Sequence, residues 1–445
     1  MRFAPPRGTR DILNEECEFR RAVAEKILTT IKSYGYQEII TPGFEELQVF
    51  IEKAGEDIVD KIYAFQDKGG RDLGLRSDMT ASIARYVARA TQDLPKPIRL
   101  CSYDRVWRYE RPRSGRSREF WQINAELFGS SSSVADAEMV ACFCDCYQSV
   151  GFDDFQVHIS HRRLLESILQ ALGVQIDRTQ AVVRAIDKRA KLTPDKYKSE
   201  LLRSGLPADQ LERLGRFVSL KGNWADVLAQ TNQAFGAEEI VAACLRELKQ
   251  IMVTLESFGK GPNCKLDFSL ARGFDYYTGV LCECVPTHGV AYGSLGGGGR
   301  YDDLVSVFGG GALPAVGFSI GFDRLILALT DQQQRQSFDA RSAYRTGPDY
   351  YVAVLGEFGL ARSIEVASLL REHGIVAEME LNNRSLRSQL DHANRIQARY
   401  VVFPGEKESD GVLIRRRDMH AGKEEMVELG ALIDSAMRRS GGKDR

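Results

Sequence analysis

The chain has 445 residues, with 60 Lys or Arg against 61 Asp or Glu, and its formal net charge at pH 7 is −1. This length exceeds what one ordinary hydrophobic core supports, so we expect two or three domains. The balanced charge excludes a strongly basic nucleic-acid binder. Any contact with nucleic acid has to come from local basic clusters.

The hydropathy of the chain indicates neither a membrane span nor a secretion signal. No uninterrupted apolar run approaches the roughly 18 residues that a span needs, and residues 1–13 lack the apolar core of a signal peptide. We therefore expect a cytoplasmic protein with no membrane partner. Its nine cysteines are irregularly spaced, which favours reduced thiols over disulfides. Cys142, Cys144 and Cys146 have no nearby histidine, which favours buried structural thiols over a metal site.

The first hundred residues alternate helix and strand. Residues 15–34 have the apolar spacing of an amphipathic helix. Residues 36–40 predict a strand that ends before Pro42, because proline cannot donate to a sheet ladder. Residues 56–75 predict a hairpin, and residues 80–89 return to helix.

An arginine-rich loop joins two predicted strands, residues 100–109 and 119–128. Five arginines fall within the eleven residues from Arg108 to Arg118. The planar guanidinium group matches phosphate oxygens and stays charged at any working pH, so such a loop can clamp a polyphosphate such as ATP. Taken alone, the loop is read more readily as a solvated charged surface, the usual fate of such runs.

A helical segment interrupts the strands in the middle of the chain. Residues 135–147 predict a helix and residues 155–159 a short strand. Residues 161–255 are rich in Leu, Ala, Lys and Glu at helical spacing and predict a helical insertion. Strands resume at residues 265–270 and 279–284.

Two further stretches are able to face a ligand. Arg272 lies beside a glycine and the pair Tyr276 and Tyr277; a buried arginine needs an anion, and tyrosines offer walls and hydroxyls to a small polar ligand. The alternative is a core tyrosine pair with Arg272 bound to Asp275. The glycines at 296–299 let backbone approach a ligand closely, although such runs also occur in hairpins and bulges.

The third arginine site follows residues 315–321, an apolar strand that turns through Gly321 into a helix carrying Asp323 and Arg324. Asp323 suits a helix start, and Arg324 is held on a rigid element. Three separated arginine sites on sheet-like elements predict one polyphosphate pocket.

The composition changes after residue 330. Residues 331–347 predict a linker, and residues 348–445 alternate strand and helix in the manner of a small α/β domain. Its basic residues fit either phosphate contacts or solvated faces; they are Arg384, Arg387, Arg395, Arg399 and Arg415 to Arg417.

The same segments, in this order, resemble the histidyl-tRNA synthetase family over nearly the whole chain. The unit ending at Thr41-Pro42 resembles motif 1 of class II synthetases, Trp107 to Gln122 resembles motif 2, and Gly317 to Leu327 resembles motif 3. The signal specific to histidine is Arg272 to Gly279 together with Gly297 to Asp302.

The resemblance implies an α+β fold and a homodimer that meets at motif 1. Residues 1–330 would form a class II synthetase domain, an antiparallel sheet flanked by helices, with the helical insertion at 161–255. After the linker at 331–347, residues 348–445 would form a C-terminal α/β anticodon-binding domain.

The implied activity is that of a histidine–tRNA ligase, which activates L-histidine with ATP and Mg²⁺ and transfers it to tRNA(His). The resemblance places Arg108 at the α-phosphate of ATP, Arg324 at the γ-phosphate end and Glu110 at the adenine side. It makes Arg272 and Arg108 the catalytic residues, with Arg272 touching both the histidine carboxylate and the α-phosphate. Cations fixed in advance lower the barrier as charge builds on the phosphorus oxygens.

The resemblance also places residues around the amino acid. Asp78 and Thr80 would bind its α-ammonium group with Gln122 beside them. Glu126 and Tyr277 would bind the imidazole, with Tyr276 next to them. Grip on both ring nitrogens discriminates without editing, because an analogue lacking one leaves a buried polar group unpaired.

Two departures from the family pattern affect these expectations. Ser77-Asp78 stands where many relatives have Pro-Glu or Tyr-Asp, so the carboxylate is kept on a changed background. Arg113 replaces a glutamine that often follows Arg-Pro in the motif 2 loop. Because that loop faces the acceptor end of the RNA in the family, we expect Arg113 and Arg116 to contact the 5′ end of the tRNA.

Two rival interpretations remain open from the sequence. The chief one is a non-catalytic histidine-sensing paralogue, such as the regulatory subunit of ATP phosphoribosyltransferase. The arginines of all three motifs and the tail beyond Gly347 count against it. The other keeps adenylation and delivers the product to a carrier protein or small molecule.

Overall fold

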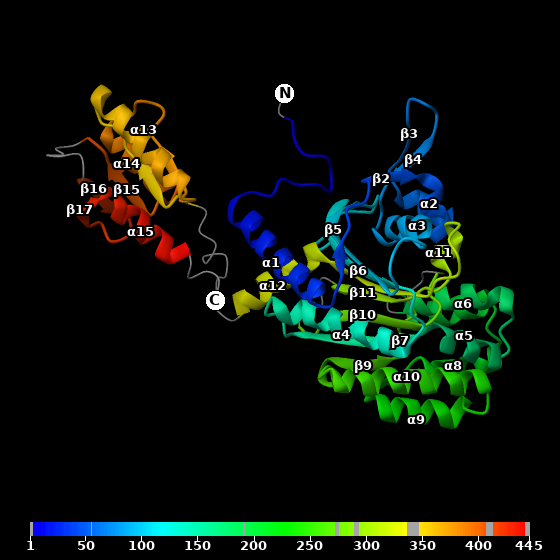
Figure 1. Cartoon of the computed structure of the whole chain (residues 1–445). Helices are drawn as coiled ribbons and strands as arrows, with labels where there is room; N and C mark the ends of the chain where they lie inside the picture. Colours follow the sequence, from blue (N-terminus) through cyan, green and yellow to red (C-terminus); the bar gives the residue numbers. More distant parts are fainter. Residues whose placement is uncertain are drawn as a thin grey trace. The chain divides into compact units, whose positions relative to one another are not determined.

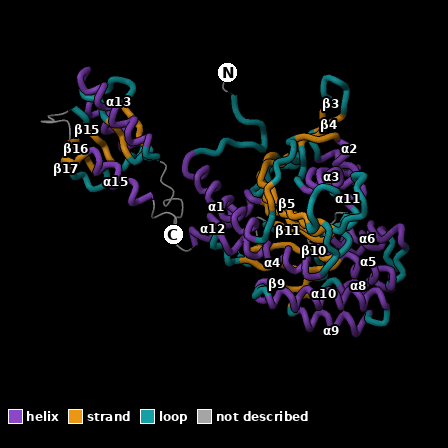
Figure 2. The backbone as a smooth tube through the Cα atoms, viewed as in Figure 1, coloured by secondary structure: helices purple, strands orange, loops and turns teal. Residues whose placement is uncertain are grey.

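The computed structural model describes residues 3–54, 56–189, 192–271, 276–288, 293–335, 347–405 and 413–440. The chain divides into two compact units. The larger comprises Met1–Ile12 and Arg20–Asp339, and the smaller comprises Leu13–Phe19 and Ala340–Arg445. Both units mix helices and strands (Figure 2).

A nine-stranded sheet forms the centre of the larger unit (Figure 1). Its six central strands, β5-β6-β12-β11-β10-β7, are antiparallel, which confirms the prediction for the middle of the sheet. In order, the nine strands are β1 (Gln37–Glu38), β5 (Ile98–Trp107), β6 (Glu119–Phe128), β12 (Ala315–Gly321), β11 (Gly296–Arg300), β10 (Val280–Pro286), β7 (Phe155–His161), β9 (Cys264–Asp267) and β8 (Lys221–Gly222).

The two ends of this sheet differ from the prediction. β1 pairs parallel to β5, and β9 pairs parallel to β7, so the sheet is mixed rather than wholly antiparallel. Parallel neighbours need long crossover connections. The chain supplies them with α2 (Leu47–Ala54) and α3 (Thr80–Ala90) before β5, and with the helical segment between β7 and β9.

Helices and a small sheet flank the large one. α4 (Ser133–Ser149) starts at Ser132, whose hydroxyl accepts a hydrogen bond from Val134 N at 3.2 Å, and it packs on β12. The remaining elements are α1 (Asn14–Ser33), α11 (Leu304–Val307), α12 (Phe322–Arg335), the 3₁₀ turn η1 (Glu56–Lys61) and a three-stranded sheet of β2 (Phe44–Glu46), β4 (Asp72–Leu75) and β3 (Ala64–Gln66).

The segment predicted as a helical insertion contains α5 (Arg162–Ala171), α6 (Ile176–Asp187), α7 (Pro194–Ser204), α8 (Leu211–Phe217), α9 (Trp224–Phe235) and α10 (Glu239–Ser257). They gather at one end of the sheet (Figure 1). The sequence did not predict β8, which pairs with β9. This pairing and the packing of α10 on α4 tie the insertion to the central sheet.

The smaller unit is a five-stranded α/β fold. Its strands run β14 (Ala377–Met379), β13 (Tyr350–Val352), β15 (Tyr400–Phe403), β16 (Leu413–Asp418) and β17 (Glu424–Glu428), and its helices are α13 (Gly356–Glu372), α14 (Leu386–Arg395) and α15 (Leu429–Ser440). The three arginines of β16 are ion-paired with Glu424 or Glu425 on β17. This pairing favours the solvated-face reading of Arg415 to Arg417.

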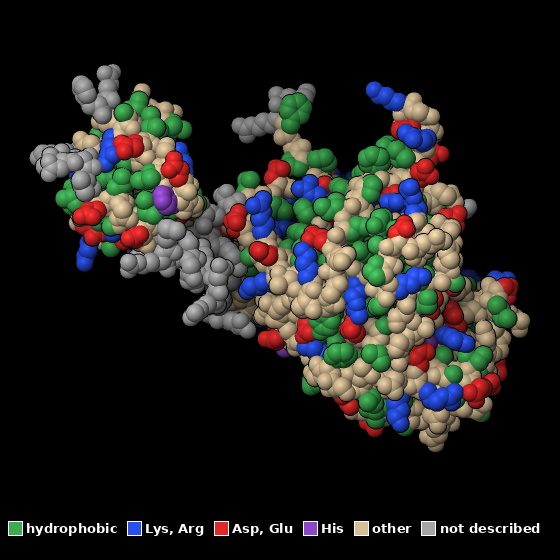
Figure 3. Space-filling view, in the orientation of Figure 1, with side chains coloured by type: hydrophobic (Ala, Val, Ile, Leu, Met, Phe, Trp, Pro, Cys, Tyr) green, Lys and Arg blue, Asp and Glu red, His purple; other side chains and the backbone are tan. Residues whose placement is uncertain are grey.

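The surface of the larger unit carries both signs of charge, as the balanced composition leads one to expect. Lys and Arg side chains are interspersed with Asp and Glu on the face of the larger unit in Figure 3. All nine cysteines are free thiols in this structure, and eight of them are buried. Among the described residues, no helix is long and apolar enough to cross a membrane. Within the same ranges, no three His, Cys, Asp or Glu side chains are grouped to hold a metal ion.

Candidate active site

A cavity of about 490 Å³ lies over the central strands of the large sheet. Strands β6, β10, β11 and β12 contribute to its lining, together with the arginine loop after β5 and the start of α3. Ten of the predicted site residues line it: Asp78, Thr80, Arg108, Glu110, Arg116, Gln122, Glu126, Tyr276, Tyr277 and Arg324. Arg113 is not among the lining residues, and Arg272 lies outside the described residues.

The glycines of β11 and β12 form a floor of backbone atoms under this cavity. Gly317 pairs with Glu126 across the two strands, and a Cβ at Gly317 would lie 1.7 Å from Glu126 Oε2. A Cβ at Gly298 would lie 2.0 Å from the Gly317 carbonyl oxygen. No side chain fits at such distances, so the glycines here provide close approach rather than a turn.

Glu126 is the most enclosed acid of the cavity, with 1% of its surface exposed. Its carboxylate accepts hydrogen bonds from Thr80 Oγ1 at 2.6 Å, from Asn124 Nδ2 at 3.1 Å and from the Tyr301 hydroxyl. Burial raises the pKa of Glu126 above its usual value, and the three hydrogen bonds oppose that rise. The carboxylate is therefore held in one orientation before any ligand arrives.

Asp78 has a partner that the sequence did not predict. Lys53, at the end of α2, donates a hydrogen bond from Nζ to Asp78 Oδ1 at 2.6 Å. Burial raises the pKa of the Asp78 carboxyl, but the charge and hydrogen bond of Lys53, together with the charge of Arg108 and the Ala81 N–H, outweigh it, and the net pKa is lowered. Asp78 is thus kept ionised close to Glu126, whose pKa is shifted in the opposite direction.

The predicted tyrosine pair lies against the same part of the cavity. The rings of Tyr276 and Tyr277 have centroids 4.4 Å apart, and the ring of Tyr276 lies 5.9 Å from that of Tyr301. Tyr277 is 6% exposed. With Glu126 and Asp78, these rings define the acidic half of the cavity. The alternative pairing of Arg272 with Asp275 concerns residues outside the described ranges.

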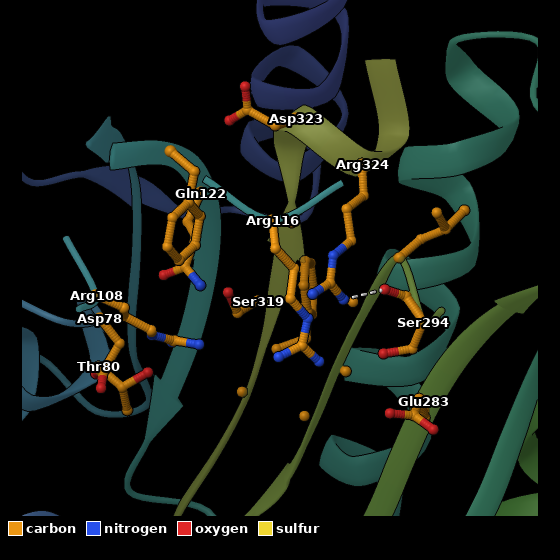
Figure 4. A pocket seen from close by; sticks show the side chains of 18 of the residues that line it. Asp78, Thr80, Arg108, Arg116, Gln122, Glu283, Ser294, Ser319, Asp323 and Arg324 are labelled. Atoms are coloured by element: carbon orange, nitrogen blue, oxygen red, sulfur yellow. Dashed lines mark hydrogen bonds between the residues drawn. The ribbon is translucent and has the colours of Figure 1, made fainter. Parts of the chain in front are cut away.

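Arginines define the opposite half. Arg324 donates from Nε to the Gly115 carbonyl at 3.0 Å and from Nη1 to the Ser294 carbonyl at 2.8 Å (Figure 4). Burial lowers the pKa of Arg324, and the nearby cations Arg116 and Arg108 lower it further. Neighbouring guanidinium groups that repel one another form a site that an anion would stabilise.

The arginine loop brings two of its arginines to this half. Arg108 donates from Nε to the Ser77 carbonyl at 2.8 Å, and its guanidinium lies 5.3 Å from the centre of the Phe120 ring. Arg116 lies beside Arg324 in Figure 4 and donates to Glu110 Oε2 at 2.8 Å. Arg108 and Arg116 therefore form part of the cavity wall, as the clamp hypothesis requires.

An N-terminal turn supports the arginine loop from outside. The Gly8 carbonyl accepts a hydrogen bond from Arg118 N at 2.8 Å. A Cβ at Gly8 would lie 2.8 Å from Arg118 Cγ and 3.0 Å from Pro112 Cγ, and the φ of Gly8 is +87°. Pro112 and Arg118, on opposite sides of the loop, therefore both pack against Gly8, a position where only glycine fits.

Several polar residues at the site take part in ways that sequence reasoning did not assign. Asp323 lines the cavity at the start of α12 and accepts hydrogen bonds from Arg20 Nη2 at 3.0 Å and Trp121 N at 2.6 Å. Glu283, opposite Gly297, lines the cavity near the arginines. The spacing of apolar residues does not mark Lys53 or Glu283 as site residues. Tyr301 could have been identified, because it lies inside the histidine-specific motif from Gly297 to Asp302.

Two family models match this chain. The model described as histidyl-tRNA synthetase matches residues 8–325. The model described as an anticodon binding domain matches residues 349–437. Together the two matches include both compact units.

The chain is also similar to named proteins over nearly its whole length. It is 39% identical over 433 residues to the histidine–tRNA ligase of Thermococcus kodakarensis, covering 97% of each chain. Over 428 residues it is 37% identical to that of Pyrococcus furiosus, covering 96% of this chain and 97% of the relative.

Solved structures show the same likeness. The histidyl-tRNA synthetase of Nostoc sp. PCC 7120 superposes with a TM-score of 0.80 at 26% identity, covering 99% of this chain and 100% of that one. An ATP phosphoribosyltransferase regulatory subunit/histidyl-tRNA synthetase from Bacillus halodurans C superposes with a TM-score of 0.74 at 26% identity, covering 88% of this chain and 97% of that one.

Proposed function

The chain belongs to the histidyl-tRNA synthetase family and has the activity of a histidine–tRNA ligase, and we propose that histidine and ATP react in the cavity between Glu126 and Arg324. One observation carries this assignment: a buried, pre-oriented carboxylate and three phosphate-matching arginines line the same space. The acidic half suits the amino acid, and the arginine half suits the nucleotide.

The reaction has two steps. A histidine carboxylate oxygen attacks the α-phosphorus of ATP, the bond to the bridging oxygen breaks, and pyrophosphate leaves with that electron pair. A terminal hydroxyl of tRNA(His) then attacks the carbonyl carbon of the adenylate and AMP leaves, while the hydroxyl proton passes to a base. The first step brings two anions together, so cations held in place beforehand lower its barrier.

The arginine half supplies those cations. We assign Arg108 to the α-phosphate and Arg324 to the γ-phosphate end, because both stems are anchored on main-chain carbonyls and need no reorganisation. Arg116 lies beside Arg324 and fits the same polyphosphate. Glu110, which holds Arg116, is assigned to the adenine side. Arg272 retains its proposed catalytic role on the family resemblance alone.

The acidic half selects histidine. We assign Glu126 and Tyr277 to the imidazole, with Tyr276 beside them, and Asp78, Thr80 and Gln122 to the α-ammonium group. Gln122 Oε1 is buried and has no hydrogen-bond partner among the described residues, so a ligand ammonium would satisfy it. The donors around Glu126 favour its ionised form. As an anion, Glu126 accepts a hydrogen bond from the imidazole N–H.

Magnesium fits the arginine half. This ion is usually bound by one or two carboxylates together with substrate phosphates. Glu283 lines the cavity near Arg324 and would hold Mg²⁺ with the ATP phosphates. The ion would neutralise the leaving pyrophosphate.

Histidine-dependent exchange of labelled pyrophosphate into ATP tests this function. We expect exchange with histidine and none without it, followed by charging of tRNA(His). The likeness to the Bacillus halodurans structure keeps the regulatory-subunit alternative in the test. A sensor that only binds histidine exchanges nothing, and exchange without charging would identify a different acyl acceptor.

The acceptor end of the RNA is assigned to the arginine loop. The backbones of Arg113 and Arg116 bond to each other in both directions, at 3.0 and 2.8 Å, so the tip is a tight turn, and Arg113 is not among the cavity-lining residues. We expect Arg113→Ala to lower the charging rate while pyrophosphate exchange is kept. Arg116→Ala should lower both, and unchanged charging in both variants would contradict the assignment.

We also propose a homodimer that meets near the predicted motif 1. Ile40 is 85% exposed, and the exposed rings of Phe44 and Phe65 lie 6.3 Å apart on the small sheet. Exposed apolar groups of this kind mark protein interfaces. Ile40→Asp should give a monomer by light scattering, whereas Val376→Asp, in the smaller unit, should leave the mass unchanged.

A further inference from the structure

A buried lysine lies in the acidic half of the cavity, where the proposed reaction gives it no role. Lys53 is 7% exposed. Its Nζ lies 2.6 Å from Asp78 Oδ1 and 4.7 Å from the centre of the Tyr276 ring. An ammonium group is costly to bury without a partner, and here a carboxylate and an aromatic face together compensate it. The position of the charge is therefore fixed by Asp78 and Tyr276.

The hydrogen bonds on Asp78 are unevenly distributed between its oxygens. Those that it accepts from the described residues, from Lys53 Nζ and from Ala81 N at 3.3 Å, both end on Oδ1. The Asp78 side chain is 22% exposed and lines the cavity. Oδ2 is thus the oxygen that remains for a ligand, and Lys53 occupies the other.

Together the two side chains present neighbouring opposite charges to the cavity, with no net charge. The main-chain end of free histidine has the same property, with an α-ammonium beside an α-carboxylate. A zwitterion can place its ammonium on Asp78 and its carboxylate in the positive potential of Lys53. An amine without a carboxylate gains only the first contact and is repelled by Lys53.

We propose that Lys53 is a specificity-determining residue that, paired with Asp78, selects the zwitterionic end of histidine over amines that lack the carboxylate. This inference rests on the proposed function, in which Asp78 binds the α-ammonium group. It assigns Lys53 to recognition rather than to the reacting atoms. Because Lys53 acts through its charge, we expect its removal to weaken the binding of one ligand and to strengthen that of the other.

The experiment compares histidine with histamine, which has the same ring and amine but no carboxylate. Lys53→Met should raise the KM for histidine in pyrophosphate exchange about tenfold, the loss of one contact to a charged group. The same change should lower the inhibition constant of histamine several-fold, because bare Asp78 then attracts its ammonium without competition. Both constants are measured at one pH, with ATP saturating.

Three further variants fix the interpretation. Lys53→Gln is a second neutral variant, so the result does not depend on the folding of one protein. Lys53→Arg keeps the charge and should keep the preference for histidine. Lys221→Met is the control. Lys221 lies on β8, at the edge of the sheet, and its Nζ is 3.1 Å from the buried Asp267 carboxylate. Its loss should change neither constant.

The outcomes separate the inference from the function on which it rests. If a neutral Lys53 variant weakens histidine and histamine equally, Lys53 only supports the structure of the cavity and the inference is wrong. If it changes neither ligand, the inference is also wrong. If the unaltered chain shows no histidine-dependent exchange, the proposed function itself fails. Opposite shifts for the two ligands support the inference.

Discussion

The two halves of the cavity reach the same end, a site prepared before the ligand arrives, by different chemistry. In the acidic half, side chains orient a carboxylate and leave it an acceptor position: Thr80, Asn124 and Tyr301 all donate to Glu126. In the arginine half, main-chain carbonyls anchor the stems of Arg108 and Arg324. Under the proposed function, the first half discriminates among amino acids and the second binds the negatively charged phosphates of ATP.

This difference predicts how each half responds to substitution. A buried hydrogen-bond network tolerates substitution poorly, because removing one member leaves others unpaired. Anchored cations act more independently, and each loss removes mainly its own attraction to phosphate. Changes in the acidic half should therefore affect histidine alone, and changes in the arginine half should affect ATP alone.

The largest effect is expected from Glu126→Gln. The amide would turn an NH₂ group toward side chains that donate to the carboxylate, and kcat/KM for histidine should fall about 10³-fold. The KM for ATP should stay within about threefold, since the arginine half is untouched. Steady-state pyrophosphate exchange measures both.

The matched control for this change is Glu138→Gln. Glu138 lies on α4 and pairs with Arg99, and it is not among the cavity-lining residues. A loss for Glu126→Gln of less than tenfold, or an equal change in the KM for ATP, would contradict the separation of the two halves.

Arg324→Met should lower the exchange rate by roughly 10²-fold, the size seen when one transition-state cation or donor is removed. The KM for ATP should rise, while histidine binding without ATP, measured by calorimetry, should be unchanged. Arg335→Met is the control, because Arg335 lies on the same helix and pairs with Asp154 at 3.0 Å. Weaker histidine binding in Arg324→Met would show that the halves are coupled.

Tyr301→Phe should lower kcat/KM for histidine about tenfold, because a buried carboxylate loses one donor. Burial already raises the pKa of Glu126, and the Tyr301 hydroxyl opposes that rise, so its removal raises the pKa further. Since recognition needs the ionised form, activity is lost as pH falls through this pKa. The acid limb of the pH profile should therefore move to higher pH, and an unmoved limb would refute the role of Tyr301.

The smallest effect is expected outside the cavity, at Gly8. An alanine there is strained by the positive φ and meets Arg118 and Pro112, so the arginine loop should shift and the KM for ATP should rise about threefold to tenfold. Gly259→Ala carries a similar strain, at φ +72°, with nothing within 4 Å of its Cβ. If both variants change the KM for ATP equally, strain alone is responsible and the loop is not involved.

Local elements could be predicted because their signal lies in contiguous residues. The predicted strand at 119–128 coincides with β6, and the predicted helix at 80–89 with α3 within one residue. The parallel pairing of β1 and β9 could not be predicted, because alternation of side chains is the same in parallel and antiparallel strands. The β16–β17 hairpin and α15 were also missed.

The same distinction holds at the site. Arg108 and Arg324 were found because an arginine cluster and a strand-to-helix turn are visible in sequence. Lys53 is an ordinary lysine on an amphipathic helix until the fold brings it to Asp78. Gly8 is likewise unmarked until it meets Arg118. A role that depends on a contact between distant segments leaves no pattern in the neighbouring residues from which it could be predicted.

If histidine binds in this cavity as proposed, the backbone floor limits how the substrate range can be altered. Gly298 and Gly317 leave no volume for a side chain, so neither position can be used to reshape the binding space for a smaller or larger amino acid. Redesign toward another substrate has to work from the walls, where Glu126 and Tyr277 stand. Variant libraries directed at the strands beneath would return only inactive proteins.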